Sequence, residues 1–190
     1  MSGQRICCIL YSKADNHPAA QSLAMISLES VTPQNAMTYK AVRLEALQDT
    51  PSAFSSTYAK ESQYSDDRWV ERASQLTGKQ ATVYLALNAG APCGLAGGYF
   101  DRDKAPHANL FSMWVASSHR RLGVGRQLVD AIAAWADSRH ASALYLLVTS
   151  NNEPAIAFYQ NLGFTLTRHT EPYPNDPALI EHEMSRSLFD

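Results

Sequence analysis

The sequence predicts a single domain of the α/β (α+β) class, in which helices flank one central sheet. Strand-like and helix-like segments alternate along most of its 190 residues, and 45% of the residues are apolar. The segment Ala143–Val148 is a short, nearly continuous apolar run between two helical patterns, which is typical of a strand covered on both faces. A crossover between parallel strands is therefore expected, and the length does not suffice for two full-sized domains.

The first half of the chain is predicted to contain two helices and a hairpin. Thr32 can cap a helix whose first turn holds Pro33, and Pro51 disfavours helix at the residue before it. Between these points, apolar residues recur at helical spacing at Met37, Ala41, Leu44 and Leu47. The expected elements are a strand over Met25–Leu28, helices over Pro33–Gln48 and Asp66–Gln75, and hairpin strands over Thr82–Leu87 and Cys93–Phe100 around the turn Asn88–Pro92.

The second half of the chain is predicted to alternate strands with helices after the polar loop Asp101–His107. The expected strands are Asn109–Val115, Ala143–Val148, Thr165–Thr167 and Ile180–Ser185. An amphipathic helix joins the first two of these strands, with an apolar stripe at Val124, Leu128, Ile132 and Trp135. The proline-rich segment Glu171–Pro177 is expected to separate the last two strands.

Charge and composition disfavour several classes of protein. The 16 basic and 18 acidic residues give a formal net charge of -2, which provides no overall basic field for nucleic acid. The apolar run Ile6–Tyr11 is too short to cross a bilayer, and Cys7, Cys8 and Cys93 form neither a disulfide framework nor a metal pair. We expect a soluble, cytoplasmic protein without a metal, with an N-terminal extension over residues 1–24 and one domain over residues 25–190.

One motif is suited to binding phosphate. The strand ending at Val115 leads through Arg120-Arg-Leu-Gly123-Val-Gly125-Arg126 directly into the amphipathic helix. Glycines let the backbone approach a ligand, and a helix N-terminus carries partial positive charge. Leu128 stands where a dinucleotide fingerprint needs its third glycine, and Gly78-Lys79-Gln80 lacks the rest of a Walker loop. A phosphate site of another kind is favoured, with a plain glycine turn as the alternative.

A second motif, Asn152–Phe164, predicts a short helix after the buried strand. Asn152 can cap it, Pro154 lies in its first turn, and Gly163 ends it. One face is formed by Ala155, Phe158, Tyr159 and Leu162. Spacing alone leaves open whether Tyr159 is a core aromatic residue or a functional phenol.

The two motifs together closely resemble the GNAT superfamily of acetyl-CoA-dependent N-acetyltransferases. The resemblance is carried by the order strand, Arg120-x-x-Gly123-x-Gly125, helix, strand, and then Asn152-x-x-Ala155-x-x-Phe158-Tyr159-x-x-x-Gly163-Phe164. It covers residues 25 to 188, and its upstream part, from Val42 through Pro51 to Trp69, looks like the start of many small bacterial members.

The resemblance implies a mixed, mostly antiparallel central sheet that splays between two parallel strands ending near Val115 and Val148. The pantetheine arm of acetyl-CoA would fill the gap like an extra strand, bound by backbone groups of Met113, Trp114 and Val115. Asn152 would contact the cofactor, and Tyr159 would lie near its sulfur. The pyrophosphate would be bound by the backbone amides of Arg120, Arg121, Leu122, Gly123, Val124, Gly125 and Arg126.

The resemblance also implies a direct transfer, in which an amine attacks the thioester and Tyr159 protonates the departing thiolate. A backbone amide between Met113 and Val115 would stabilise the oxyanion, and such a preorganised donor is commonly worth ~3 kcal/mol. A phenol with a pKa near ~10 is protonated at neutral pH and can act as the acid. The base is unassigned because residues 108–116 contain no Asp, Glu or His, which leaves Glu29, Asp66 and His107 as candidates acting through water.

We therefore expect an N-acetyltransferase that acts on the primary amine of a small molecule. A peptide or protein N-terminus or a lysine is the alternative acceptor, and a catalytically weak acyl-CoA-binding or interaction domain is the alternative of another class. The acceptor cannot be identified from spacing, and the residues expected around it are Glu29, Tyr58, Tyr64, Trp69 and Tyr173. The oligomeric state is open as well, although a homodimer is common among proteins that resemble this one.

Overall fold

The computed structural model describes residues 26–101 and 107–189, so the expected N-terminal extension lies outside the described residues. The strands are β1 (Ile26–Ser30), β2 (Ala81–Asn88), β3 (Ala91–Phe100), β4 (His107–Val115), β5 (Ala143–Thr149), β6 (Thr165–Tyr173) and β7 (Asp176–Ser187). The helices are α1 (Ala36–Asp49), α2 (Tyr58–Glu61), α3 (Asp66–Gln75), α4 (Val124–Asp137) and α5 (Glu153–Gln160). Short 3-10 helices η1, η2 and η3 cover Pro33–Asn35, Pro51–Ala53 and Ser117–His119.

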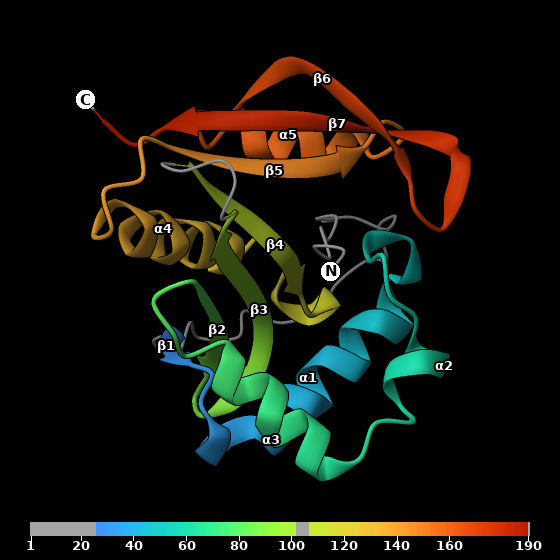
Figure 1. Cartoon of the computed structure of the whole chain (residues 1–190), viewed down its shortest axis with the longest axis vertical. Helices are drawn as coiled ribbons and strands as arrows, with labels where there is room; N and C mark the ends of the chain where they lie inside the picture. Colours follow the sequence, from blue (N-terminus) through green and yellow to red (C-terminus); the bar gives the residue numbers. More distant parts are fainter. Residues whose placement is uncertain (1–25, 102–106, 190) are drawn as a thin grey trace.

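Seven strands form one sheet in the order β1-β2-β3-β4-β5-β7-β6. Helices α1 to α3 lie on one side of it and α4 and α5 on the other (Figure 1). Every neighbouring pair is antiparallel except β4 and β5. The expected class, a mixed and mostly antiparallel sheet flanked by helices, is confirmed.

The parallel pair β4–β5 is short and then splays. Its register is confined to His107↔Ala143, Ala108↔Leu144 and Asn109↔Tyr145, although the strands continue to Val115 and Thr149. Beyond Asn109 the facing edges of the two strands are therefore not joined to each other. The gap expected between the two parallel strands is present, and it opens toward their carboxyl ends.

Each face of the sheet has its own core. Val124, Leu128, Ile132 and Trp135 of α4 are all buried against the sheet, as their spacing predicts. On the opposite face, Tyr39, Trp69 and Trp114 are among the side chains packed under α1 and α3. A Cβ added at Gly97 would lie 2.3 Å from the Phe111 ring, so the absence of a side chain on β3 makes room for an aromatic ring on β4.

The apolar stripe expected on α1 is partly wrong. Met37 is 42% exposed and Ala41 is also exposed, whereas Tyr39, Val42 and Ala46 face the core. The helical period was misread because a charged residue, Arg43, stands on the buried face. A charged residue on the buried face of a helix interrupts the apolar stripe, so the spacing of apolar residues does not identify that face.

The last two strands are longer than expected, and the interpretation of Glu171–Pro177 as a separating segment is wrong. Strand β6 runs to Tyr173 and β7 starts at Asp176, so only Pro174 and Asn175 form the turn. Proline is tolerated here because β6 is an edge strand and Pro177 lies at the start of β7, where a missing N–H costs little. Among the described helices, none has both the length and the apolar character needed to cross a membrane.

Candidate active site

The loop before α4 has the backbone geometry of an anion site. Gly123 is the N-cap of α4 with φ +83°, and Arg121 also adopts a positive φ of +65°. Glycine offers no side chain to cap the helix, and the first turn of α4 contains no acidic residue. The first N–H groups of the helix therefore face outward with the positive end of the helix dipole.

A cavity of about 180 Å³ lies against this loop. It is bordered by Val115 at the end of β4, by the loop and the first turn of α4, and by Phe158, Asn161 and Leu162 from α5 and the residues after it. Arg121 and Arg126 at its rim are exposed and form no ion pair with any side chain in the described ranges. The cavity thus combines an apolar wall with outward-facing amides and two available cations.

The Arg120 side chain binds the ends of β4 and α1. Its Nε donates to the Val115 carbonyl at 2.9 Å, and its Nη2 donates to the Asp49 carboxylate at the end of α1. Trp114 Nε1 donates to the same carboxylate oxygen at 2.8 Å. The Arg120 side chain therefore ties the loop to α1, and only its backbone remains available for the anion.

Asp49 is ionised in this arrangement. Burial opposes its charge, but the hydrogen bonds from Trp114 and Thr50 and the Arg120 guanidinium outweigh burial and hold its pKa below the ordinary value. A carboxylate at the C-terminal end of a helix is unfavourable by itself. The three donors around Asp49 offset that cost and anchor the end of β4.

The second loop glycine, Gly125, has a packing role. It is buried in α4, and an added Cβ would lie 3.1 Å from both Met113 Cε on β4 and Phe158 Cζ on α5. Nothing lies within 4 Å of a Cβ added at Gly123. The two glycines of the motif therefore serve different needs, a positive φ at Gly123 and close packing at Gly125.

Asn152, the expected cofactor contact, lies just past the end of β5. Its Oδ1 accepts the Ala155 N–H at 3.3 Å and caps α5, as its sequence position predicts. Its Nδ2 is buried and has no hydrogen-bond partner among the described residues. A buried amide donor is costly unless it is paired, so this atom is suited to an acceptor on a ligand.

Tyr159 is fully buried on the inward face of α5. Its ring lies 5.2 Å from the Phe158 ring and 5.6 Å from the Phe164 ring, both in edge-on geometry. It belongs to the same core as Met113 and Val115 of β4. The tyrosine is thus close-packed in the core between the sheet and helices α4 and α5.

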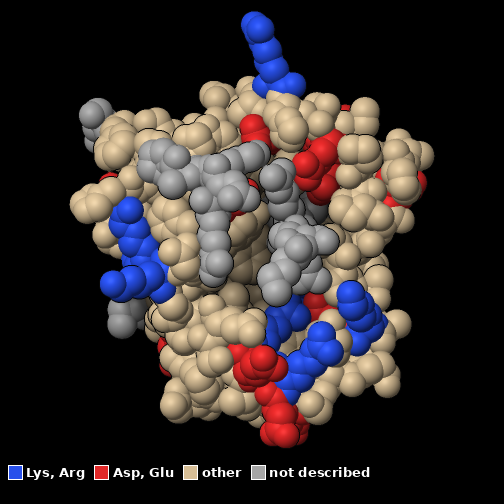
Figure 2. Space-filling view, viewed as in Figure 1, with Lys and Arg blue, Asp and Glu red and all other residues tan. Residues whose placement is uncertain are grey.

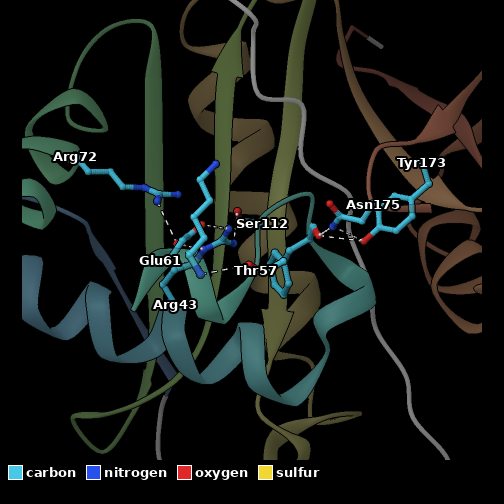
Figure 3. Close-up of polar contacts among 9 residues, drawn as sticks. Arg43, Thr57, Glu61, Arg72, Ser112, Tyr173 and Asn175 are labelled. Carbon is cyan, nitrogen blue, oxygen red and sulfur yellow. Dashed lines mark hydrogen bonds and ion pairs between the residues drawn. The ribbon is translucent and has the colours of Figure 1, made fainter. Parts of the chain in front are cut away.

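A buried charged cluster that sequence reasoning did not predict links α1, α2 and α3 to β4 (Figure 3). Arg43 donates from Nε and Nη2 to the two oxygens of Glu61 at 3.0 and 2.8 Å, and from Nη1 to Ser112 Oγ at 3.0 Å. Arg72 adds an ion pair to Glu61 at 3.1 Å. Burial opposes the charge of Glu61, but the two arginines outweigh it and lower its pKa.

A bridge joins the β6–β7 turn to the segment after η2. Tyr173 Oη and Asn175 Nδ2 both donate to the Phe54 carbonyl, at 3.0 and 2.7 Å (Figure 3). Phe54 follows α1 on the β4 side of the splay, whereas the turn belongs to the β5 side. The bridge therefore connects the two halves of the splayed sheet through side chains.

The candidate bases do not converge on the splay. Glu29 lies on the edge strand β1, three positions from β4 in the sheet. Asp66 is 70% exposed and pairs with Lys40 at 2.7 Å. His107 belongs to the closed end of the parallel pair, with its ring 4.8 Å from that of Tyr145.

The residues expected around the acceptor are also not gathered into one site. Trp69 is fully buried beside Tyr39, and Tyr173 is committed to the Phe54 bridge. Tyr64 instead borders an open cleft of about 710 Å³ between α3 and the sheet. The lining of that cleft also includes Lys60, Asp67, Arg68, Glu71, Tyr99 and Phe111.

Charges on this side of the molecule are mixed. Figure 2 shows basic and acidic side chains next to each other over the part that Figure 1 fills with α1 to α3. Within the described residues, no group of three or more His, Cys, Asp or Glu side chains is arranged to hold a metal ion. His119 is engaged by Asn88 and Ser118, each at 2.9 Å from a ring nitrogen.

Comparison with known proteins gives consistent results. The acetyltransferase (GNAT) family model matches residues 43–164, more than half of the chain. The chain is 35% identical over 112 residues to the 5-NmdU N-acetyltransferase of Pseudomonas phage PaMx11, which covers 57% of this chain and 76% of the relative. It is 31% identical over 107 residues to the ribosomal protein bS18-alanine N-acetyltransferase of Salmonella typhimurium, covering 55% and 71% of the two chains.

A solved structure shares the fold over most of the chain. The yncA protein of Salmonella typhimurium, solved with its cofactor acetyl-CoA, superimposes with a TM-score of 0.67. The two sequences are 16% identical, and the match covers 87% of this chain and 95% of that one.

Proposed function

This chain belongs to the acetyltransferase (GNAT) family, and on that premise we propose that it transfers the acetyl group of acetyl-CoA to the primary amine of a small molecule. One observation carries the proposal. Beyond Asn109↔Tyr145, no pairing within the described residues joins β4 to β5, and the gap between these two strands leads to the uncapped N-terminus of α4 and its cavity of about 180 Å³. A narrow slot ending in an anion site suits an extended arm that ends in a pyrophosphate. We assign the activity to one domain over residues 25–190.

In this proposal the backbone does most of the cofactor binding. The free edge of β4 at Met113, Trp114 and Val115 holds the pantetheine arm as a strand would. The pyrophosphate occupies the loop Arg120, Arg121, Leu122, Gly123, Val124, Gly125 and Arg126, where Arg121 and Arg126 supply the charge. The unpartnered Nδ2 of Asn152 donates to the cofactor where it passes the end of β5.

The transfer needs a donor to the oxyanion, an acid for the departing thiolate and an acceptor for the proton that the attacking amine nitrogen loses, and we assign that last proton to water because no candidate side chain lies where it could take it. Acetyl-CoA supplies an activated acyl group, and a backbone N–H between Met113 and Val115 stabilises the oxygen on which charge develops. Tyr159 is the catalytic acid that gives its phenolic proton to the sulfur. A phenol is protonated at neutral pH and can donate its proton to a thiolate.

A small amine is favoured as the acceptor by the surroundings of the splay. The bridge from Tyr173 and Asn175 to Phe54 spans the open side, so a folded protein surface cannot approach closely. The cleft of about 710 Å³ has the size of small-molecule sites, and its lining carries both acidic and basic side chains, namely Asp67, Glu71, Lys60, Arg68 and Arg72. A peptide or protein N-terminus, or a lysine, is the alternative, since one relative is named for an alanine of a ribosomal protein.

A catalytically weak acyl-CoA-binding domain is the alternative of another class. It is favoured by one specific observation: neither Glu29, Asp66 nor His107 lies where it could take the proton of an attacking amine. Under this alternative the cofactor motifs would bind acetyl-CoA without turnover.

A thiol-release assay over a library of amines, peptides and acetyl-CoA tests the proposal. We expect acceptor-dependent release of CoA with at least one small primary amine. Release with peptides alone would establish the alternative acceptor. Calorimetric binding of acetyl-CoA without turnover on any amine would refute the enzymatic proposal.

A further inference from the structure

Strand β4 contains one extra residue at the start of the splay. In the pairing of β3 with β4, Leu95 faces Trp114 and Gly97 faces Phe111, so Ser112 and Met113 together oppose one residue of β3. Ser112 adopts φ +52°. This left-handed conformation is normally taken by glycine in bulges of this kind, and a side chain strains it.

The bulge changes the face of the sheet to which successive β4 side chains point. Phe111 packs in the core beneath α1 and α3, Ser112 contacts Arg43 of α1, and Met113 packs in the core beneath α4. Two successive residues thus point to the same side before the alternation resumes. The conformation of Ser112 therefore decides the direction of the backbone that follows it.

Arg43 holds the strained residue. Its guanidinium is fully buried, lies 4.5 Å from the Phe54 ring centroid and binds both oxygens of Glu61. The bidentate ion pair fixes the plane of the guanidinium. In this orientation Nη1 donates a hydrogen bond to Ser112 Oγ, 3.0 Å away. Figure 3 shows Arg43 between Glu61 and Ser112, with Arg72 on the far side of Glu61.

The bulge lies on the part of β4 that contains the proposed oxyanion donor. The last β4–β5 pair is Asn109↔Tyr145, so Ser112 and Met113 lie on the free part of β4. This is the stretch to which the proposed function assigns the oxyanion donor, and the inference rests on that assignment. A donor must be held close to its productive position for it to lower the barrier.

We propose that Arg43 is a positioning residue: its hydrogen bond to Ser112 holds the β4 bulge in the conformation that directs the backbone N–H groups of Met113 and Val115 into the splay. Arg72 orients Glu61, and Glu61 in turn keeps the Arg43 guanidinium in the orientation that reaches Ser112. The buried charged cluster thus serves the geometry of the site from a distance and does not touch the substrates.

Ser112→Ala and Ser112→Gly form a matched pair that tests this role. Both remove the hydroxyl, but glycine adopts a positive φ without strain, whereas alanine does not. Ser112→Ala should lower kcat about 10- to 100-fold, with the KM for acetyl-CoA changing less, and Ser112→Gly should stay within about 3-fold of the wild type. Arg43→Lys keeps the positive charge but loses the planar guanidinium that binds Glu61 and Ser112 together. Its kcat should fall as in Ser112→Ala, and adding Ser112→Gly should restore the kcat.

Two kinetic outcomes overturn the proposal. A wild-type kcat in folded Ser112→Ala would show that the bond does not position the donor. Equal losses in Ser112→Ala and Ser112→Gly would show that the hydroxyl matters for another reason than the conformation of the bulge. If Arg43→Lys does not fold, the Ser112 pair alone decides.

Amide hydrogen exchange at Ala116, whose N–H donates to the Cys93 carbonyl at 2.9 Å just after the bulge, separates this inference from the proposed function when it is measured on the full chain without acetyl-CoA. Exchange should rise in Ser112→Ala and in Arg43→Lys, and less in Ser112→Gly. If the wild type neither binds nor uses acetyl-CoA, the proposed function fails. The same exchange pattern would still support the inference that Arg43 stabilises the conformation of the bulge. Unchanged exchange in Ser112→Ala would overturn it.

Discussion

Replacing Gly123 with alanine should weaken acetyl-CoA binding about 5- to 30-fold. Gly123 has φ +83° and an added Cβ meets nothing within 4 Å, so the substitution acts through backbone conformation alone. A side chain in this region costs about 1–2 kcal/mol, which corresponds to that range of affinity. The loop is exposed and can relax to a negative φ without ligand, so the cost falls mainly on the bound state.

Gly90→Ala is the matched control. Gly90 has φ +82°, nothing lies within 4 Å of its added Cβ, and it belongs to the β2–β3 turn. It should lose up to about 1–2 kcal/mol of folding free energy in urea denaturation but bind acetyl-CoA like the wild type. Titration calorimetry on both variants measures the affinities. Equal affinities in the two variants would refute the assignment of the pyrophosphate to the loop before α4.

Tyr159→Phe should lower kcat about 10²–10⁴-fold with little change in acetyl-CoA affinity, and a wild-type kcat measured where chemistry limits the rate would leave Tyr159 a core residue. Asn152→Asp keeps an oxygen to cap α5 but loses the amide donor; calorimetry should show about 5- to 10-fold weaker acetyl-CoA binding at an unchanged unfolding midpoint, whereas unchanged affinity would exclude Nδ2 as a cofactor contact. The lowered pKa of Glu61 means that its stabilisation is complete above its ordinary pKa of about 4.3 and is lost as the pH falls through the folded value. Urea denaturation between about pH 6 and pH 3 should therefore show wild type and Glu61→Gln converging on acidification, and parallel curves would contradict the role of this ion pair.

Local signals in the sequence were sufficient for much of the fold and for the outline of the site. Gly123 as a helix start, Asn152 as a cap and the apolar stripe of α4 each depend on residues within a turn or two of one another. Such contacts are encoded by spacing, because the period of a helix is the same in every protein. The splay followed only from the resemblance to a family, since no pattern within either strand marks where its pairing ends.

Contacts between distant residues could not be predicted in this way. The ion pair of Arg120 with Asp49 has no local signal, because the two residues lie 71 positions apart. Arg43 and Ser112 are 69 positions apart, and a charged residue on a buried helix face has no signature in one sequence. The strand over Pro172 was missed because tolerance of proline depends on the place of β6 at the edge of the sheet.

The bridge between Phe54 and the β6–β7 turn has a consequence for how acceptor range can change by mutation. Both of its hydrogen bonds end on a main-chain carbonyl, so any residue at position 54 can accept them. The donors are side chains, and a single codon change at Tyr173 or Asn175 removes one of them. Substitutions at Tyr173 and Asn175 would therefore open the splay to bulkier amines while leaving the buried Phe54 ring and the loop before α4 untouched.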